Sequence, residues 1–138
     1  MPLTLTITEG VLTADKVRQV IAHLTDSFLE HHGLSGNTVM TPNITAHVNI
    51  IPKGFTFSGG KAVEGVWIET KTPSFALADH DIQASYFSKA TQFIHALTNG
   101  KLPKEKIWTN ATHAVDGTWN IDGVTLTNAG IVEAISKG

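Results

Sequence analysis

Pro2, directly behind the initiator Met1, has the most distinctive chemistry in this sequence. If Met1 is removed, the proline nitrogen becomes a terminal secondary amine, more basic and nucleophilic than most groups available near neutral pH. An apolar pocket disfavours its charged form, so its pKa falls and the free amine can act as a general base. Kept protonated, the same amine can act as a general acid. Many proteins begin with Met-Pro without consequence, so the importance of Pro2 depends on the fold that follows it.

The sequence offers few other groups that could do chemistry. Its seven histidines show no metal-binding pattern, because the nearest pair, His31 and His32, would point about 100° apart on a helix. No spaced third ligand with an acidic partner follows them, and His23, His80 and His95 are expected on exposed helix faces. Cysteines, a P-loop and a nucleophile elbow are all absent. We therefore expect no metal and no other cofactor.

The composition is that of a soluble globular protein without a strongly charged surface. The chain has 138 residues, 16% of them charged, and a formal net charge of -2, so neither nucleic acid nor an anionic membrane is indicated as a partner. No apolar run approaches the roughly 18 residues of a membrane span, and the polar start does not resemble a signal peptide. We expect a cytoplasmic protein.

The elements that must position Pro2 begin immediately after it. Residues 3–8 alternate Leu or Ile with Thr, which predicts a strand with one buried face. Thr13 can cap a helix, whose apolar positions recur at helical spacing over residues 17–28, and Gly33 is a plausible end. Residues 44–50 alternate again. The first unit is therefore predicted as β-α-β.

The second half of the chain follows the same plan. Residues 66–70 predict a strand, Asp79 can cap a second helix that ends at Gly100, and residues 106–113 predict the next strand. The two units recur at a nearly constant spacing of roughly 60 residues, which is typical of a duplicated unit. No identity of residues accompanies the spacing, so it indicates architecture alone.

Together these elements predict an α+β fold: two tandem β-α-β units form a four-stranded mixed sheet with two helices on one face. A short strand (residues 124–126) and a final helix (128–136) complete a single domain, 1–138, with pseudo-repeats at about 2–60 and 64–125. The other sheet face is left uncovered although the strands are rich in apolar residues. We therefore expect other subunits to bury it.

Met-Pro followed at once by a strand and two β-α-β units resembles the tautomerase superfamily (4-oxalocrotonate tautomerase-like). The likeness is to fused, trimeric members around cis-3-chloroacrylic acid dehalogenase and to fungal oxalocrotonate-tautomerase-like proteins. The resemblance implies that Met1 is removed, that Pro2 is catalytic, and that the protein is a homotrimer acting on a small molecule. The matching stretches are Leu12-Thr13, Thr25-Asp26 and residues 57–60, 106–108 and 119–123.

The partner residues of the dehalogenase-type machinery are mostly missing. Its helix-one histidine falls on Phe28, its two arginines fall on Pro73 and Ala76, and its tyrosine falls on Asn110. In the region of its glutamate, Asp122 is the only acid. Because a guanidinium fork is the usual clamp for a substrate carboxylate, the loss of both arginines argues against hydrolytic dehalogenation of a haloacrylate.

Five further residues are candidates for a pocket around Pro2. A lysine at the end of the third strand could supply one point charge, and an amide or imidazole could polarise a carbonyl oxygen as an enolate develops. The strong alternative is a strand position facing solvent for Lys71 and Asn110, and packing in the core or at an interface for Trp119. The candidates are Lys71, Asn110, His113, Trp119 and Asp122.

Three functions fit these observations. The first is a tautomerase or isomerase in which Pro2 moves a proton between carbon and oxygen of a small carbonyl or unsaturated acid, or adds water to a conjugated acid. The second is a binding or structural protein that keeps the fold without the chemistry. The third is an isomerase or cyclase for a bulky intermediate, with Phe55, Phe57, Trp108 and Trp119 lining a larger apolar pocket.

Overall fold

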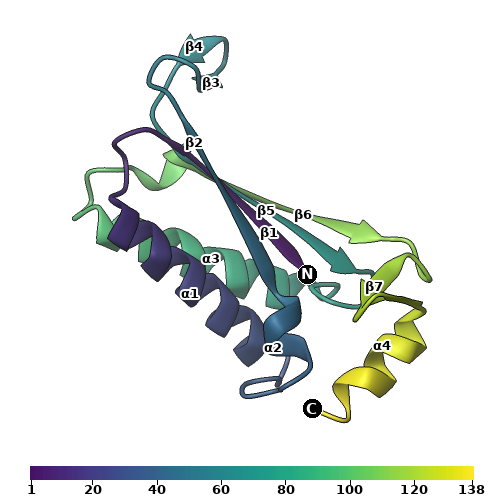
Figure 1. The fold of residues 1–138 in the computed structure, drawn as a ribbon. Helices are drawn as coiled ribbons and strands as arrows, with labels where there is room; N and C mark the ends of the chain where they lie inside the picture. Colours follow the sequence, from purple (N-terminus) through teal and green to yellow (C-terminus); the bar gives the residue numbers. More distant parts are fainter.

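A mixed four-stranded sheet forms the centre of the computed structural model, which describes all 138 residues (Figure 1). Its strand order is β2-β1-β5-β6. The pairs β1–β2 and β5–β6 are parallel, and β1 runs antiparallel to β5. The two β-α-β units therefore meet along an antiparallel seam, and the predicted α+β architecture is confirmed. The strands are β1 (Pro2–Thr8), β2 (Thr45–Ile51), β5 (Val66–Pro73) and β6 (Ile107–Ala114).

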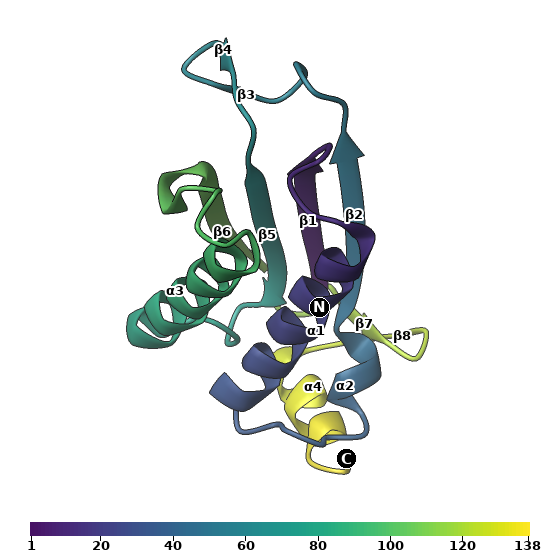
Figure 2. The same ribbon diagram turned by 90° about the vertical axis from the view of Figure 1, so that its left-hand side faces the viewer.

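Two long helices, α1 (Ala14–His31) and α3 (His80–Leu97), cover one face of the sheet (Figures 1 and 2). Both begin at the predicted caps: the Thr13 side chain accepts a hydrogen bond from the Lys16 N–H, and the Asp79 carboxylate accepts two from the first turn of α3. Each cap satisfies backbone donors that the helix itself leaves free.

The core lies between this sheet face and the two helices. Leu3, Leu5 and Ile7 alternate toward the helices and are buried. From the helices, Phe28 and Tyr86 pack edge to face, with ring centroids 6.1 Å apart. The Tyr86 hydroxyl donates to the carbonyl of Leu24 in α1, and burial raises the pKa of this phenol. One hydrogen bond thus joins the two helices inside the core.

The other face of the sheet is open and more polar than the sequence suggested. The apolar residues of the strands point mainly toward the helices, so the open face carries hydroxyl, amide, imidazole and charged groups. These are Thr4, Thr6, Thr45, His47, Asn49, Glu69, Lys71, Asn110 and Thr112. Large apolar groups gather only at one end, where Trp67 and Trp108 stack with centroids 4.8 Å apart.

A short hairpin, β3 (Phe57–Ser58) and β4 (Lys61–Ala62), projects beyond this end of the sheet (Figures 1 and 2). Phe55 and Phe57 on this arm are exposed. With Ile51 and Trp67 they line an open groove of about 450 Å³. The sequence had not indicated this arm as an element of its own.

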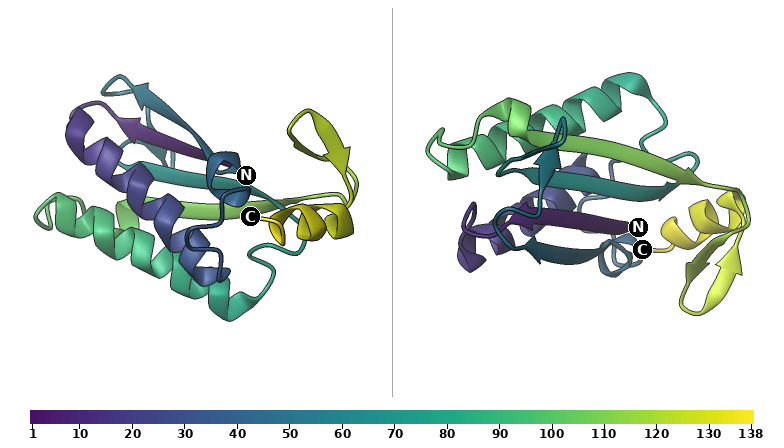
Figure 3. Two further views of the ribbon diagram at one scale, coloured as in Figure 1. Left: turned by 60° about the horizontal axis from the view of Figure 1, so that its bottom comes forward. Right: turned by 90° about the horizontal axis from the view of Figure 1, so that it is seen from above.

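The opposite end of the sheet, where the chain starts, is surrounded by short elements. They are α2 (Met40–Asn43), a hairpin of β7 (Trp119–Ile121) and β8 (Val124–Leu126), and α4 (Asn128–Ile135). Figure 3 shows the amino terminus beside α2, with the carboxy-terminal segment at the same end. A single turn of 3₁₀ helix, Lys104–Lys106, precedes β6. None of the helices has the length and apolar character needed to cross a membrane.

Candidate active site

The amino terminus of the unprocessed chain is buried. Met1 is only 2% exposed, its amine donates to the carbonyl of Asn43, and its own carbonyl accepts from the Thr45 N–H at 3.0 Å. Pro2 follows as the half-buried first residue of β1, paired with Thr45. Burial lowers the pKa of the Met1 amine from its ordinary 8.0 to about 6. The Met1 amine is therefore largely neutral at physiological pH.

The surroundings of Met1 follow from the strand registers. Continuing the pairings of β1 by one residue places Ile44 on one side of Met1 and Thr72 on the other, and both are buried. Met1 belongs to the same buried cluster as Phe28 and Met40. Its side chain therefore fills space on the helix-covered side of the sheet.

A small apolar cavity lies at this end of the molecule. It measures about 30 Å³, room for about one water molecule, and nine of its eleven lining residues are apolar. The walls come from the end of α1, from α2, from the end of β5 and from the carboxy-terminal segment. They include Phe28, Met40, Phe75, Trp119 and Ile131. The arrangement favours an apolar group over a charged one.

His32 is the one titratable residue of the cavity wall. The Leu77 N–H donates to its Nε2 at 3.1 Å, so Nδ1 carries the proton and donates to the carbonyl of Phe28 at 2.8 Å. Desolvation lowers the pKa of His32, and its ring stacks on that of Phe28. His32 is therefore neutral with both nitrogens engaged, which suits it to hold the Leu77 loop rather than to exchange protons.

The structure brings two of the predicted site residues to the face that carries the Pro2 ring. Leu3 pairs with Thr70, so the next position along β5 in register with Pro2 is Lys71, whose side chain is exposed. In β6 the residue in register with Lys71 is Thr112. Asn110 lies on the same face, one row further from the terminus. Thr112, which the sequence did not single out, is thus better placed than Asn110.

The other predicted site residues lie elsewhere. His113 points to the helix-covered side, where its Nε2–H donates to the Ala76 carbonyl at 3.0 Å. Trp119 lines the small apolar cavity. Asp122 occupies the exposed turn of the β7–β8 hairpin, with a positive φ of 52°. Trp119 thus lies at the end of the sheet where the chain starts, whereas His113 and Asp122 do not face Pro2.

The larger aromatic pocket considered from the sequence is not formed within one chain. Trp108 stacks on Trp67 at the start of β5 and β6, next to the groove lined by Phe55 and Phe57. Trp119 lines the cavity near Pro73, at the far end of β5. These aromatic residues therefore belong to two sites at opposite ends of the sheet.

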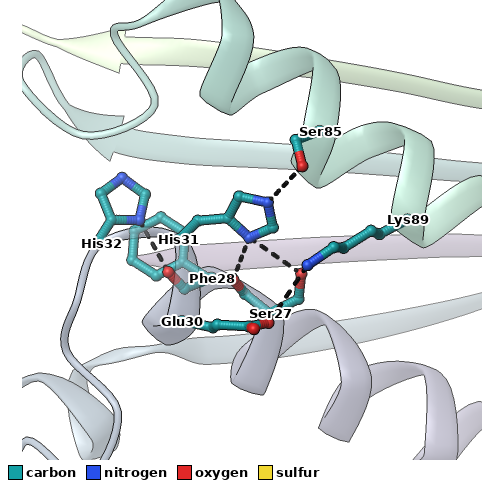
Figure 4. A network of polar contacts seen from close by, with 7 residues as sticks. All are labelled: Ser27, Phe28, Glu30, His31, His32, Ser85 and Lys89. Carbon is teal, nitrogen blue, oxygen red and sulfur yellow. Dashed lines mark hydrogen bonds and ion pairs between the residues drawn. The ribbon is translucent and has the colours of Figure 1, made fainter.

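The neighbouring histidines His31 and His32 point apart, as Figure 4 shows. His31 bridges the helices: its Nδ1–H donates to the Ser27 carbonyl, and its Nε2 accepts from the Ser85 hydroxyl at 2.9 Å. A serine hydroxyl hydrogen-bonded to a histidine is also the arrangement of a catalytic nucleophile and its general base. Ser85, however, lies within α3, where helical hydrogen bonds occupy the backbone N–H groups that an oxyanion would need. No group of three or more His, Asp or Glu side chains is placed to hold a metal ion.

Comparison with known proteins places the fold. No family model matches the sequence, and no curated protein matches it. Solved structures do match, including N1, a member of the cis-3-chloroacrylic acid dehalogenase family, with a TM-score of 0.77 and 16% identity over 96% of this chain and 88% of that one. The chain has the tautomerase fold.

Two further matches agree with this assignment of the tautomerase fold. Pt0534, whose structure was solved after inactivation by 2-oxo-3-pentynoate, has a TM-score of 0.75 at 13% identity, with 94% of this chain and 98% of that chain covered. Q0, a fused 4-OT protein solved as a symmetric trimer, has a TM-score of 0.74 at 10% identity, with 95% and 98% covered. At such identities the likeness is one of fold.

Proposed function

We propose that this protein is a tautomerase-type enzyme in which Pro2, freed by removal of Met1, is the general base and acid. Its substrate would be a small carbonyl compound or unsaturated acid, interconverted between keto and enol forms or hydrated. The observation that carries the proposal is the buried amino terminus, where desolvation lowers the pKa of the Met1 amine to about 6. The same desolvation would lower the pKa of the Pro2 amine that takes its place. A neutral amine near pH 7 is the form that can accept a proton.

The proton transfers balance within the site. The Pro2 nitrogen takes a proton from the enol oxygen or from the carbon beside the carbonyl, and becomes a charged secondary ammonium. It returns that proton to the other atom and regains its neutral form. Between the two steps the substrate is an enolate, whose oxygen needs a donor. The Lys71 ammonium and the Thr112 hydroxyl are the groups in register with Pro2 on the open face.

We also propose that the protein assembles as a homotrimer. Three features support this: the uncovered sheet face, the exposed Phe55 and Phe57 beside it, and the symmetric trimer formed by the fused 4-OT protein with the same fold. The arm that carries both phenylalanines extends past the sheet, where a neighbouring subunit can reach it.

A second function is favoured by one specific observation. Met1 fits the core with 2% exposure, and its amine already has a hydrogen-bond partner. A retained Met1 would turn the Pro2 nitrogen into an amide nitrogen, which has no useful basicity. The protein would then be a non-catalytic binding or structural member of the fold.

Intact mass measurement combined with chemical labelling separates the two functions. The natively purified protein is exposed to 2-oxo-3-pentynoate, the compound that inactivated Pt0534. The enzyme proposal requires loss of Met1 and a single adduct confined to Pro2, with the lysines unmodified. The control is Pro2→Leu, whose bulkier second residue blocks removal of Met1. A wild-type chain that retains Met1 would instead support the binding protein.

A further inference from the structure

The start of β1 is held by other strands on both of its sides. β1 lies between β2 and β5 in the sheet, as Figure 2 shows. Pro2 pairs with Thr45 of β2, and Leu3 pairs with Ala46 on one side and with Thr70 on the other. The first residues of the chain therefore belong to the interior of the sheet. A terminus that is tied into a sheet in this way does not fray as a free chain end does.

Met1 is held by its backbone and by its side chain. Its amine donates to the carbonyl of Asn43, and its carbonyl accepts from the Thr45 N–H at 3.0 Å. Met1 is 2% exposed, and Leu3 is completely buried. Lifting residues 1–3 out of the sheet therefore breaks both of these hydrogen bonds and exposes two large apolar side chains to water.

Removal of Met1 requires this opening. A methionine aminopeptidase adds one water molecule to the Met1–Pro2 amide, which releases methionine and leaves Pro2 with a free secondary amine. The aminopeptidase has to enclose the terminal amine and the methionine side chain, and both are buried in the folded chain. Hydrolysis of the folded chain therefore proceeds only from an open form, and its rate follows the population of that form.

We propose that Met1 can be removed only before β1 pairs with β2 and β5, so that a chain that folds with Met1 in place keeps it. The Pro2 nitrogen of such a chain is an amide nitrogen without useful basicity. The fraction of reactive termini is thus set when the chain is made and does not change after folding. This last consequence rests on the function proposed above, whereas the retention of Met1 rests on the strand pairing alone.

Release of methionine by a purified methionine aminopeptidase tests this inference. The full chain is made by cell-free translation with peptide deformylase and without the aminopeptidase, so that it folds with Met1 in place. The aminopeptidase is then added, and the processed fraction is followed by intact mass. A synthetic peptide of residues 1–10 gives the rate for the same sequence without the fold.

Thr45→Pro loosens the terminus without changing the residues that the aminopeptidase binds. It removes the N–H that donates to Met1. Thr45 is the first residue of the edge strand β2, where proline is tolerated. Ile44 already has the extended conformation, with φ −89° and ψ 95°, that a following proline favours. The control is Thr98→Ala, which removes a hydroxyl that makes two hydrogen bonds just after α3, near the opposite end of β1.

We expect the folded wild type to release methionine roughly a hundredfold more slowly than the peptide. Thr45→Pro should raise the rate about fivefold because one hydrogen bond is lost, and Thr98→Ala should leave it unchanged. Hydrogen exchange of the unprocessed wild type measures the opening without any substitution, and the Thr45 N–H should be protected. Release at the rate of the peptide, or an unprotected Thr45 N–H, would overturn the inference.

The failure of the proposed function gives a different pattern, which labelling with 2-oxo-3-pentynoate reveals. The folded chain that retains Met1 should form no adduct at Pro2. If a processed chain also forms none, while the folded unprocessed chain still resists the aminopeptidase, the retention of Met1 stands and catalysis by Pro2 is wrong. If the folded chain is processed as fast as the peptide and is then labelled at Pro2, the retention is wrong and the catalytic amine stands.

Discussion

At the scale of single residues, the terminal amine links stability to pH. In a chain that retains Met1, the pKa of this amine is about 6 when folded and near 8.0 when unfolded. Between these values the unfolded chain binds more protons, so the free energy of unfolding rises with pH across the window from 6 to 8, by about 1–2 kcal/mol after allowance for solvent screening. Urea unfolding on either side of this window measures it. A chain acetylated on Met1 should lose the slope, and an unchanged slope would contradict the assignment.

His32 makes a second prediction at this scale. Replacing it with leucine leaves the buried Leu77 N–H without an acceptor, which should lower the free energy of unfolding by about 1–3 kcal/mol at neutral pH. Because burial lowers the pKa of His32 when folded, wild-type stability should also fall as the pH drops below the ordinary value of 6.5, and His32→Leu should lack this contribution. His80→Leu, at an exposed position, is the control. Equal losses in both variants would argue against the Leu77 contact.

The identity of the site residues could be predicted only in part, for reasons visible at single positions. Pro2 could be identified from the sequence because its chemistry depends on its position directly after Met1. The role of His32 depends on a loop 45 residues away, which no local pattern encodes. Lys71 was found from its place at the end of a strand, whereas Thr112 is in line with it only through the register of β5 and β6.

At the scale of elements, the contact between α1 and α3 contains an unpaired buried polar atom, which a single substitution can remove. His23 stacks parallel on Phe93 with centroids 4.0 Å apart, but its Nε2 is buried without a hydrogen-bond partner. His23→Phe should keep the stacking and remove the unpaired nitrogen, raising the free energy of unfolding by about 1 kcal/mol. Ser85→Ala, which removes the hydrogen bond to His31, should lower it by a similar amount. Thermal unfolding measures both, and a destabilised His23→Phe would show that this nitrogen reaches water.

The long elements, the short strand β8 and the last helix α4 could be predicted, whereas α2 and the β3–β4 hairpin could not. Thr13 and Asp79 cap the helices because a side-chain oxygen at that position satisfies backbone donors, a local rule that the sequence displays. The β3–β4 hairpin has only two residues in each strand, too few for any periodicity to register. Its role depends on where the arm projects, which is a property of the folded chain.

At the scale of the whole molecule, the apolar end of the open face predicts assembly. Thr, Asn, His, Glu and Lys side chains cover most of the open face, so the apolar groups that need cover are those around Trp67 and the arm. We expect a homotrimer of 14.8 kDa chains by light scattering after gel filtration. Phe57→Lys places a charge in that contact and should yield monomers. Val124→Lys is the matched control, because Val124 is 58% exposed and Phe57 is 56% exposed, yet Val124 lies on the β7–β8 hairpin at the other end of the sheet. A trimer that survives Phe57→Lys but dissociates in Val124→Lys would move the interface to the carboxy-terminal segment, beside the cavity at the terminus.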